Sequence, residues 1–286
     1  MSTSSHILTS ADGTPIGYSV TGAGPVLIIV DGAFCSRVFG PSPKVAAELT
    51  GDFTVVTYDR RGRGASGNTG PWSLEREVED LAALVEAVGG PASLLGFSSG
   101  GALALEAAAR LSAVDRVIVY EIPFVLDPTG NVMPDGFIEQ VEAHVADDRP
   151  GDAARQFMLH VGTPRPMVAL MRLLPMWKKL AAAARTLPYD LRLLGDTQHG
   201  KPLPRERFAA VGAPTLVLAG GKSPEWMRTG AQAIAATLPD GTYSELPGQT
   251  HMVKARVIAP SVVEFLDQPA PAVASASREQ GRTVAA

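Results

Sequence analysis

The pattern Gly-Phe-Ser-Ser-Gly at residues 96–100 is the strongest chemical signal in the sequence. It follows a short apolar run and precedes an Ala/Leu-rich segment with helical spacing, which predicts a strand, a sharp turn and a helix. Glycines fit two residues before and after the turn's apex, because side chains there would collide with the closely packed strand and helix. Ser98 is therefore the candidate nucleophile, with its hydroxyl beside the N–H groups of a helix N-terminus. Ser99 lies one residue past the apex and is the less favoured serine.

The elements that must hold Ser98 in place alternate between strands and helices. Strand-like runs at 6–9 and 16–21 flank an Ala-Asp-Gly turn signal and predict an antiparallel hairpin at a sheet edge. Buried-type strands are predicted at 26–30, 54–58, 93–97, 117–121 and 215–219, with a further strand at 243–246. Helices are predicted at 74–88 with Ser73 as N-cap, from the elbow to about 110, at 225–238 and near 258–266. This alternation predicts an α/β fold with a mostly parallel, doubly covered central sheet.

Between residues 122 and 207 helical segments replace the alternation. The block follows the strand that ends at Glu121 and precedes the next strand, so we expect a helical lid inserted over the carboxyl edge of the sheet, above Ser98. The predicted organisation is a core of 1–121 and 208–268 and a lid of 122–207. The Pro/Ala/Ser-rich tail, 269–286, is expected to be disordered.

The predicted lid carries several soft, apolar side chains. They suit an adaptable apolar pocket wall, or they only pack the lid onto the sheet. These residues are Trp177, Met158, Met167, Met171 and Met176.

Composition restricts the classes of function. The chain has 286 residues, of which 45% are hydrophobic and 19% charged, and a net charge of −4 without a basic stripe, which argues against nucleic-acid and membrane partners. A single cysteine, Cys35, excludes an intramolecular disulfide framework and suits a reducing compartment. No signal-peptide pattern, membrane-spanning run or metal-ligand motif is present. We expect a cytoplasmic protein of unspecified oligomeric state.

Three features together resemble the α/β-hydrolase fold superfamily. They are the elbow at 96–100, the Tyr-Asp-Arg-Arg-Gly-Arg-Gly-Ala-Ser segment at 58–66 after a strand, and a late Gly-Gln-Thr-His at 248–251 before a final helix. The resemblance covers about residues 6–267 and is specific for the fold rather than for the substrate. It implies that Ser98 is the nucleophile and His251 the base. It also implies an oxyanion hole made by the backbone N–H groups of Ser99 and Ala33.

The remaining histidines are not expected to be catalytic. One lies in the edge hairpin and three in the predicted lid, where packing or surface roles are expected. They are His6, His144, His160 and His199. The charged segment at 59–66 is interpreted as a structural turn that braces neighbouring strand ends.

The sequence departs from the family pattern in the oxyanion loop. Asp31-Gly32 stands where the family usually has His-Gly. The turn needs the glycine more than the histidine, so the donor at Ala33 survives the change. Asp31 is a negative group near a site that must stabilise an oxyanion. We therefore expect its side chain to point away or to be paired.

The second departure concerns the triad acid. The family's usual aspartate follows the strand at 215–219, where this chain has Ser223. Glu121, at the end of the strand beside the nucleophile strand, is the favoured replacement, and some members, the haloalkane dehalogenases among them, look similar in this placement. Glu225 and a serine–histidine dyad without an acid remain alternatives. Glu121 could instead pair with Arg60 or Arg61 at the strand ends.

The resulting hypothesis is a serine hydrolase. His251 removes the Ser98 proton, Glu121 orients the imidazole, and an ester, thioester or lactone of an apolar small molecule passes through an acyl-enzyme without metal or cofactor. Two other classes remain open. One is non-hydrolytic or carbon–carbon bond chemistry on the same fold, such as a cyclase, lyase or perhydrolase. The other is a non-catalytic ligand binder.

Overall fold

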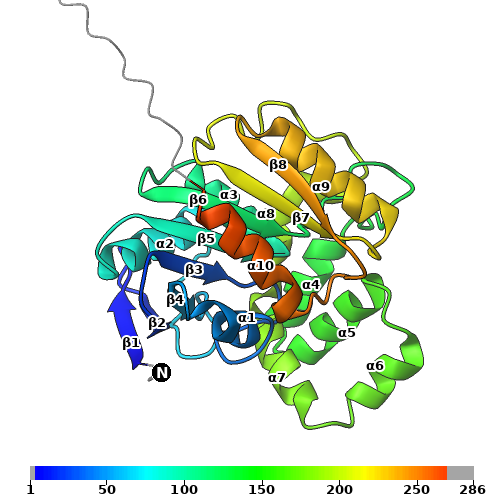
Figure 1. Cartoon of the computed structure of the whole chain (residues 1–286). Coiled ribbons are helices and arrows are strands. Elements are labelled where there is room, and N and C mark those ends of the chain that lie inside the picture. The colour runs from blue at the N-terminus through cyan, green and yellow to red at the C-terminus, as the bar shows by residue number, and fades with distance from the viewer. Residues whose placement is uncertain (1–3, 269–286) are drawn as a thin grey trace, which may run out of the picture.

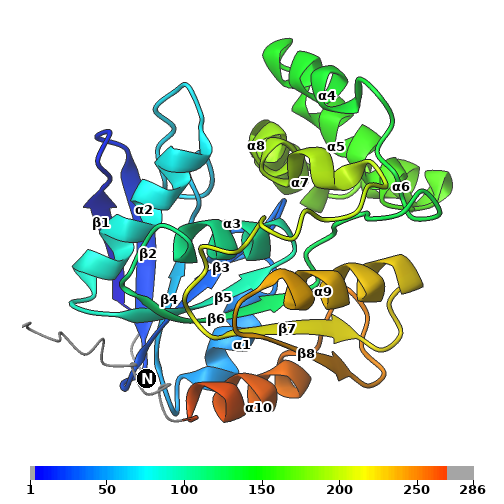
Figure 2. The same cartoon turned by 90° about the horizontal axis from the view of Figure 1, so that it is seen from above.

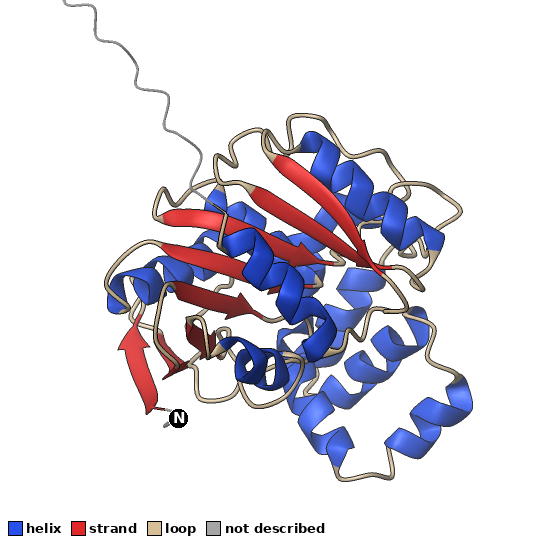
Figure 3. Ribbon diagram, in the orientation of Figure 1, coloured by secondary structure: helices blue, strands red, loops and turns tan. Residues whose placement is uncertain are grey.

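The central feature of the computed structural model, which describes residues 4–268, is an eight-stranded sheet (Figures 1 and 3). The first two strands form the predicted antiparallel hairpin, and the second of them also pairs antiparallel with its other neighbour, whereas the remaining six strands pair parallel with one another. In spatial order the strands are β1 (Ser4–Thr9), β2 (Pro15–Thr21), β4 (Thr54–Tyr58), β3 (Val26–Val30), β5 (Ala92–Phe97), β6 (Val114–Tyr120), β7 (Thr215–Gly220) and β8 (Gly241–Leu246). The α/β prediction with a mostly parallel sheet is confirmed.

Helices cover both faces of the sheet because the central strands are apolar on both sides. Along β3, Leu27 and Ile29 join the core under one helical layer, while Ile28 and Val30 join the core under the other. Figure 2 shows α1 (Ser42–Leu49) and α10 (Ala255–Leu266) on one face, and α2 (Leu74–Ala87), α3 (Ser99–Ala108) and α9 (Glu225–Thr237) on the other. Ser73 caps α2 as predicted, its side chain accepting a hydrogen bond from the Arg76 N–H.

A helical insertion connects β6 to β7. Its own apolar core includes Phe137, Val141 and Leu187, and α8 packs against α3, so the insertion rests on the helix that follows Ser98. Figure 2 shows it standing on the side of the sheet that carries α3. Its elements are α4 (Phe137–Ala146), α5 (Pro150–His160), α6 (Arg165–Met171), α7 (Met176–Ala183), α8 (Leu187–Leu194) and two short 3₁₀ turns, Ala184–Thr186 and Gly195–Gln198.

The sequence also makes predictions for the end of the chain and for the end of β6. The tail prediction for 269–286 lies outside the described residues. The strand predicted at 117–121 runs from Val114 to Tyr120, and Glu121 leaves it with φ 48°. Among the described helices, none combines the length and the apolar character needed to cross a membrane.

Candidate active site

Ser98 sits at a sharp turn between β5 and α3. Its φ of 54° and ψ of −128° are strained for a non-glycine residue, and the strain is held by hydrogen bonds from Ser98 N to the Tyr120 carbonyl (2.9 Å) and from Gly101 N to the Ser98 carbonyl (2.9 Å). A Cβ at Gly96 would lie 2.5 Å from the Gly101 Cα, and one at Gly100 would lie 2.2 Å from the Val30 carbonyl oxygen. The glycines are thus required by backbone contact, as the elbow pattern predicts.

Glu121 and His251 form an ion-pair geometry at the same edge of the sheet. Glu121 follows β6, is fully buried, and its Oε2 lies 2.9 Å from His251 Nδ1. Its other oxygen, Oε1, accepts a hydrogen bond from Gly220 N at 2.7 Å. The ring of His251 remains 42% exposed. This arrangement fixes the imidazole through Nδ1 and leaves Nε2 available to a hydroxyl group.

The loop that carries His251 is tied down by its neighbours. The Tyr120 hydroxyl donates to the Thr250 carbonyl at 2.7 Å, and Lys222 N donates to the Gln249 carbonyl at 2.8 Å. A Cβ at Gly220 would lie 2.6 Å from the Gln249 carbonyl oxygen, so only glycine permits this approach of the two loops. Tyr120 therefore supports both Ser98, through its carbonyl, and the histidine loop, through its hydroxyl.

Neither the alternative acid, Glu225, nor the residue at the family's usual acid position, Ser223, contacts His251. Glu225 is exposed at the start of α9, and Ser223 is buried with no partner for its Oγ in the described chain. Arg60 pairs with Glu77 and Asp190, and Arg61 with Asp12 and Asp80, so neither arginine claims Glu121. Of the carboxylates considered from the sequence, Glu121 is the one that the fold brings to the imidazole.

The two expected oxyanion donors lie on either side of the elbow. Ser99 opens α3, where first-turn N–H groups lack intrahelical acceptors. The loop after β3 lies against the elbow, since a Cβ at Gly32 would fall 2.9 Å from the Ser98 Cβ. Within residues 4–268 the Ala33 N–H and the Ser98 Oγ have no hydrogen-bonding partner. Catalytic hydrogen bonds often close only when substrate is bound.

Asp31 is buried next to the oxyanion loop, and neither of its carboxyl oxygens has a well-formed hydrogen bond to a described residue. Burial raises the pKa of Asp31 to about 7, and the nearby Ser42 hydroxyl and the Arg63 and Arg60 guanidiniums oppose the shift only in part. The carboxyl group is thus buried without an ion-pair partner among the described residues, and the expectation that Asp31 would be paired is not met. Protonation is what reduces its negative charge near neutral pH.

The charged segment after β4 forms a buried ion-pair network. Arg60 binds Glu77 through two parallel hydrogen bonds of 2.7 and 2.6 Å, and it also donates to Asp190 Oδ1 at 2.6 Å. Burial opposes ionisation of Asp190, but the Arg63 and Arg60 guanidiniums hold its pKa below its usual range. The sequence predicts a structural brace at 59–66 but does not reveal Asp190 as its partner. No local pattern marks that residue, because it comes from α8, far along the chain.

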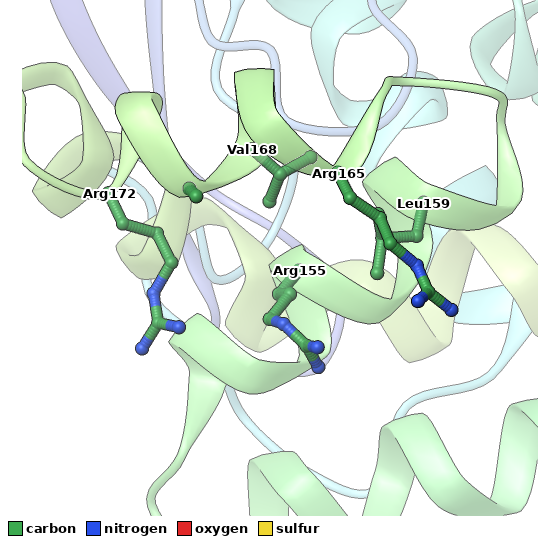
Figure 4. Close-up of a pocket in the computed structure, with 6 residues that line it drawn as sticks. Arg155, Leu159, Arg165, Val168 and Arg172 are labelled. Atoms are coloured by element: carbon green, nitrogen blue, oxygen red, sulfur yellow. The ribbon is translucent and has the colours of Figure 1, made fainter.

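The insertion contains a cavity of about 360 Å³ between α5 and α6. Figure 4 shows the side chains of Arg155, Arg165 and Arg172 at it, together with the apolar Leu159 and Val168. The methionines and Trp177 expected at a pocket wall do not line this cavity; Trp177 packs against the insertion's own core. Within residues 4–268 no group of three His, Cys, Asp or Glu side chains is arranged to hold a metal ion.

Comparison with known proteins gives the family of the chain. Residues 22–262 match the model of the alpha/beta hydrolase family. The chain is 31% identical over 227 residues to a pimeloyl-[acyl-carrier protein] methyl ester esterase of Stenotrophomonas maltophilia, covering 77% of this chain and 83% of that one.

Solved structures show the same fold. An alpha/beta hydrolase from Sphaerobacter thermophilus is 43% identical with a TM-score of 0.83, covering 91% of this chain and 100% of that one. A thermophilic esterase from Thermogutta terrifontis is 21% identical with a TM-score of 0.67, covering 92% and 98%. The elbow, the sheet order and these matches together place the chain in the alpha/beta hydrolase family.

Proposed function

We propose that the protein is a serine esterase in which Ser98, His251 and Glu121 form the catalytic triad. The observation that carries the proposal is the 2.9 Å contact between His251 Nδ1 and the buried Glu121 carboxylate, at the sheet edge where Ser98 is presented. A buried carboxylate on Nδ1 selects the tautomer whose Nε2 can accept a proton and stabilises the imidazolium that forms. The strained backbone of Ser98 is the conformation that an exposed nucleophile needs.

The reaction follows from these positions. Ser98 Oγ attacks the ester carbonyl while His251 Nε2 takes the hydroxyl proton, and the oxyanion receives hydrogen bonds from the N–H groups of Ala33 and Ser99. Collapse of the tetrahedral intermediate expels the alcohol, which takes the proton from His251. Water, deprotonated by the same nitrogen, then attacks the acyl-enzyme, releases the carboxylic acid and restores Ser98.

The substrate class is an ester, thioester or lactone of an apolar small molecule. The relative from Stenotrophomonas maltophilia carries methyl ester esterase in its name, which supports simple carboxylic esters as the first compounds to try. The helical insertion serves as the lid over Ser98 in this proposal. Nucleic acid and membrane are not part of it.

A p-nitrophenyl ester assay tests the proposal. We expect a stoichiometric burst of p-nitrophenol from acylation of Ser98, absent in Ser98→Ala. A folded wild-type chain that turns over no ester and takes no label from a fluorophosphonate contradicts the proposal and leaves ligand binding as the function. Turnover retained in Ser98→Ala points instead to chemistry that does not pass through the serine.

A further inference from the structure

The carboxylate of Asp190 connects the insertion to the elbow. It lies on α8, is buried, and accepts three hydrogen bonds: from Ser99 Oγ at 2.8 Å and Arg60 Nη1 at 2.6 Å on one oxygen, and from Arg63 Nη2 at 2.5 Å on the other. Ser99 is the first residue of α3 and one of the two expected oxyanion donors. Its side chain is bound to Asp190 and so anchors the donor residue to the insertion.

Arg63 extends the same connection to the other donor. Its Nη1 donates to the Gly32 carbonyl at 2.7 Å. That carbonyl and the Ala33 N–H belong to one trans, planar peptide unit, so they point in opposite directions. Holding the carbonyl on the Arg63 side therefore turns the Ala33 N–H away from Arg63. A hydrogen bond to a carbonyl also polarises the N–H of the same peptide, which strengthens it as a donor.

The backbone after Ala33 requires such a clamp. Phe34 has φ 62°, a left-handed conformation that costs a bulky non-glycine residue free energy and persists only when its surroundings impose it. Arg63 Nη1 also approaches the Cys35 carbonyl at 3.4 Å, so one guanidinium holds a carbonyl group before Phe34 in the chain and another after it. The Phe34 ring packs on Phe157 of the insertion, with ring centroids 5.4 Å apart.

We propose that Arg63 and Asp190 are positioning residues for the oxyanion hole, which they set through the Gly32–Ala33 peptide and through Ser99. The inference rests on the proposed function, because an oxyanion hole is needed only if a tetrahedral intermediate forms on Ser98. According to this proposal, catalysis requires that α8 pack against the core so that Asp190 reaches Arg63 and Ser99. Neither residue touches the substrate, so the effect falls on transition-state stabilisation rather than on binding.

The test compares two equally buried arginines. Arg63→Lys keeps the charge but cannot satisfy Asp190, Gly32 and Thr186 at once, because lysine lacks the planar fork of donors. Arg61→Lys is the matched control, since Arg61 binds Asp80 and Asp12 and has no contact with the oxyanion loop in the described chain. Ser99→Ala removes the second connection, the hydrogen bond from Ser99 Oγ to Asp190. Asp190→Asn is less informative, because it leaves Arg60 and Arg63 short of a buried carboxylate and can prevent folding.

We expect Arg63→Lys to lower kcat for p-nitrophenyl esters by about 10- to 100-fold with little change in KM, since losing a whole oxyanion donor costs about 10²–10³. Affinity for a trifluoromethyl ketone, which forms a tetrahedral adduct, should fall by the same factor. The pH profile of kcat/KM should keep its wild-type shape, because neither Arg63 nor Asp190 contacts His251 in the described chain. Ser99→Ala should give a smaller loss of the same kind, and Arg61→Lys should keep wild-type kcat.

Intact-mass detection of the acyl-enzyme distinguishes failure of the positioning role from failure of the proposed esterase function. If folded Arg63→Lys acylates Ser98 as fast as wild type, or if Arg61→Lys is equally impaired, the positioning role is overturned and the proposed esterase stands. If the wild-type chain never acylates Ser98, the proposed function fails and the inference fails with it.

Discussion

Replacing Glu121 by glutamine tests the triad, because glutamine has one acceptor oxygen where the carboxylate has two. The carboxylate serves two partners, Gly220 N at 2.7 Å and His251 Nδ1 at 2.9 Å, each on its own oxygen. Glutamine has the same shape but only one acceptor oxygen. The Gly220 N–H is buried and can only donate, and leaving it unpaired costs about 1–3 kcal/mol. The amide oxygen therefore turns to Gly220 and the amide NH₂ turns to His251.

The consequence is the wrong imidazole tautomer. An NH₂ facing Nδ1 makes that nitrogen the acceptor, so the proton sits on Nε2, which can no longer take the Ser98 proton. We expect kcat to fall by about 10⁴-fold, or about 5 kcal/mol of transition-state stabilisation at about 1.4 kcal/mol per tenfold. Both amide groups remain paired, so the free energy of unfolding should change by no more than about 1–2 kcal/mol.

The assay is the pre-steady-state burst with a p-nitrophenyl ester, measured beside urea unfolding. Glu225→Gln is the matched control, because Glu225 is exposed and should keep wild-type kinetics. Activity of Glu121→Gln within about tenfold of wild type refutes the reasoning. A large loss in Glu225→Gln refutes it equally.

Three further predictions follow from buried groups. The folded pKa of Asp31, about 7, lies above its ordinary value of 3.8, so between these values the folded chain holds a proton that the unfolded chain has lost, and the wild type loses stability as the pH rises. The free energy of unfolding of Asp31→Asn should therefore rise by roughly 2–3 kcal/mol relative to wild type between pH 5 and pH 8 in urea unfolding. An equal difference between the two proteins at both pH values contradicts this. Burial raises the pKa of Cys35 to about 12, so at pH 8 its reaction with Ellman's reagent should be about 10³-fold slower than that of free cysteine, and should reach the free rate in urea. Tyr120→Phe loses the hydrogen bond to the Thr250 carbonyl, so the free energy of unfolding should fall by about 1 kcal/mol and kcat should fall several-fold. An unchanged kcat would show that the loop carrying His251 keeps its position without this hydrogen bond.

Local patterns were sufficient where one segment makes its own structure. The elbow could be predicted because the contacts of Gly96 and Gly100 lie within one strand–turn–helix unit and the adjoining strand. The sheet could be predicted because strands buried on both faces are continuously apolar. The sequence also suggested Glu121 as the partner of His251, since the ends of neighbouring parallel strands meet at one edge.

The ionic interior could not be predicted in the same way. Arg60 and Arg63 are charged residues in a Gly-rich turn, a pattern that usually means exposure, yet both are buried by partners as distant as Asp190. Pairing between segments more than a hundred residues apart leaves no spacing to detect. The raised pKa of Asp31 could not be predicted either, because it depends on burial by the folded chain rather than on the neighbouring residues in the sequence.

The most direct test of the central claim is to locate the adduct of a fluorophosphonate by peptide mass spectrometry. We predict one phosphonyl group per chain, attached to Ser98, absent in Ser98→Ala, and formed at least about 10³-fold more slowly in His251→Ala, because the serine then lacks its base. A label on Ser99, or no label on a folded chain that still hydrolyses esters, would contradict the assignment of Ser98 as the nucleophile.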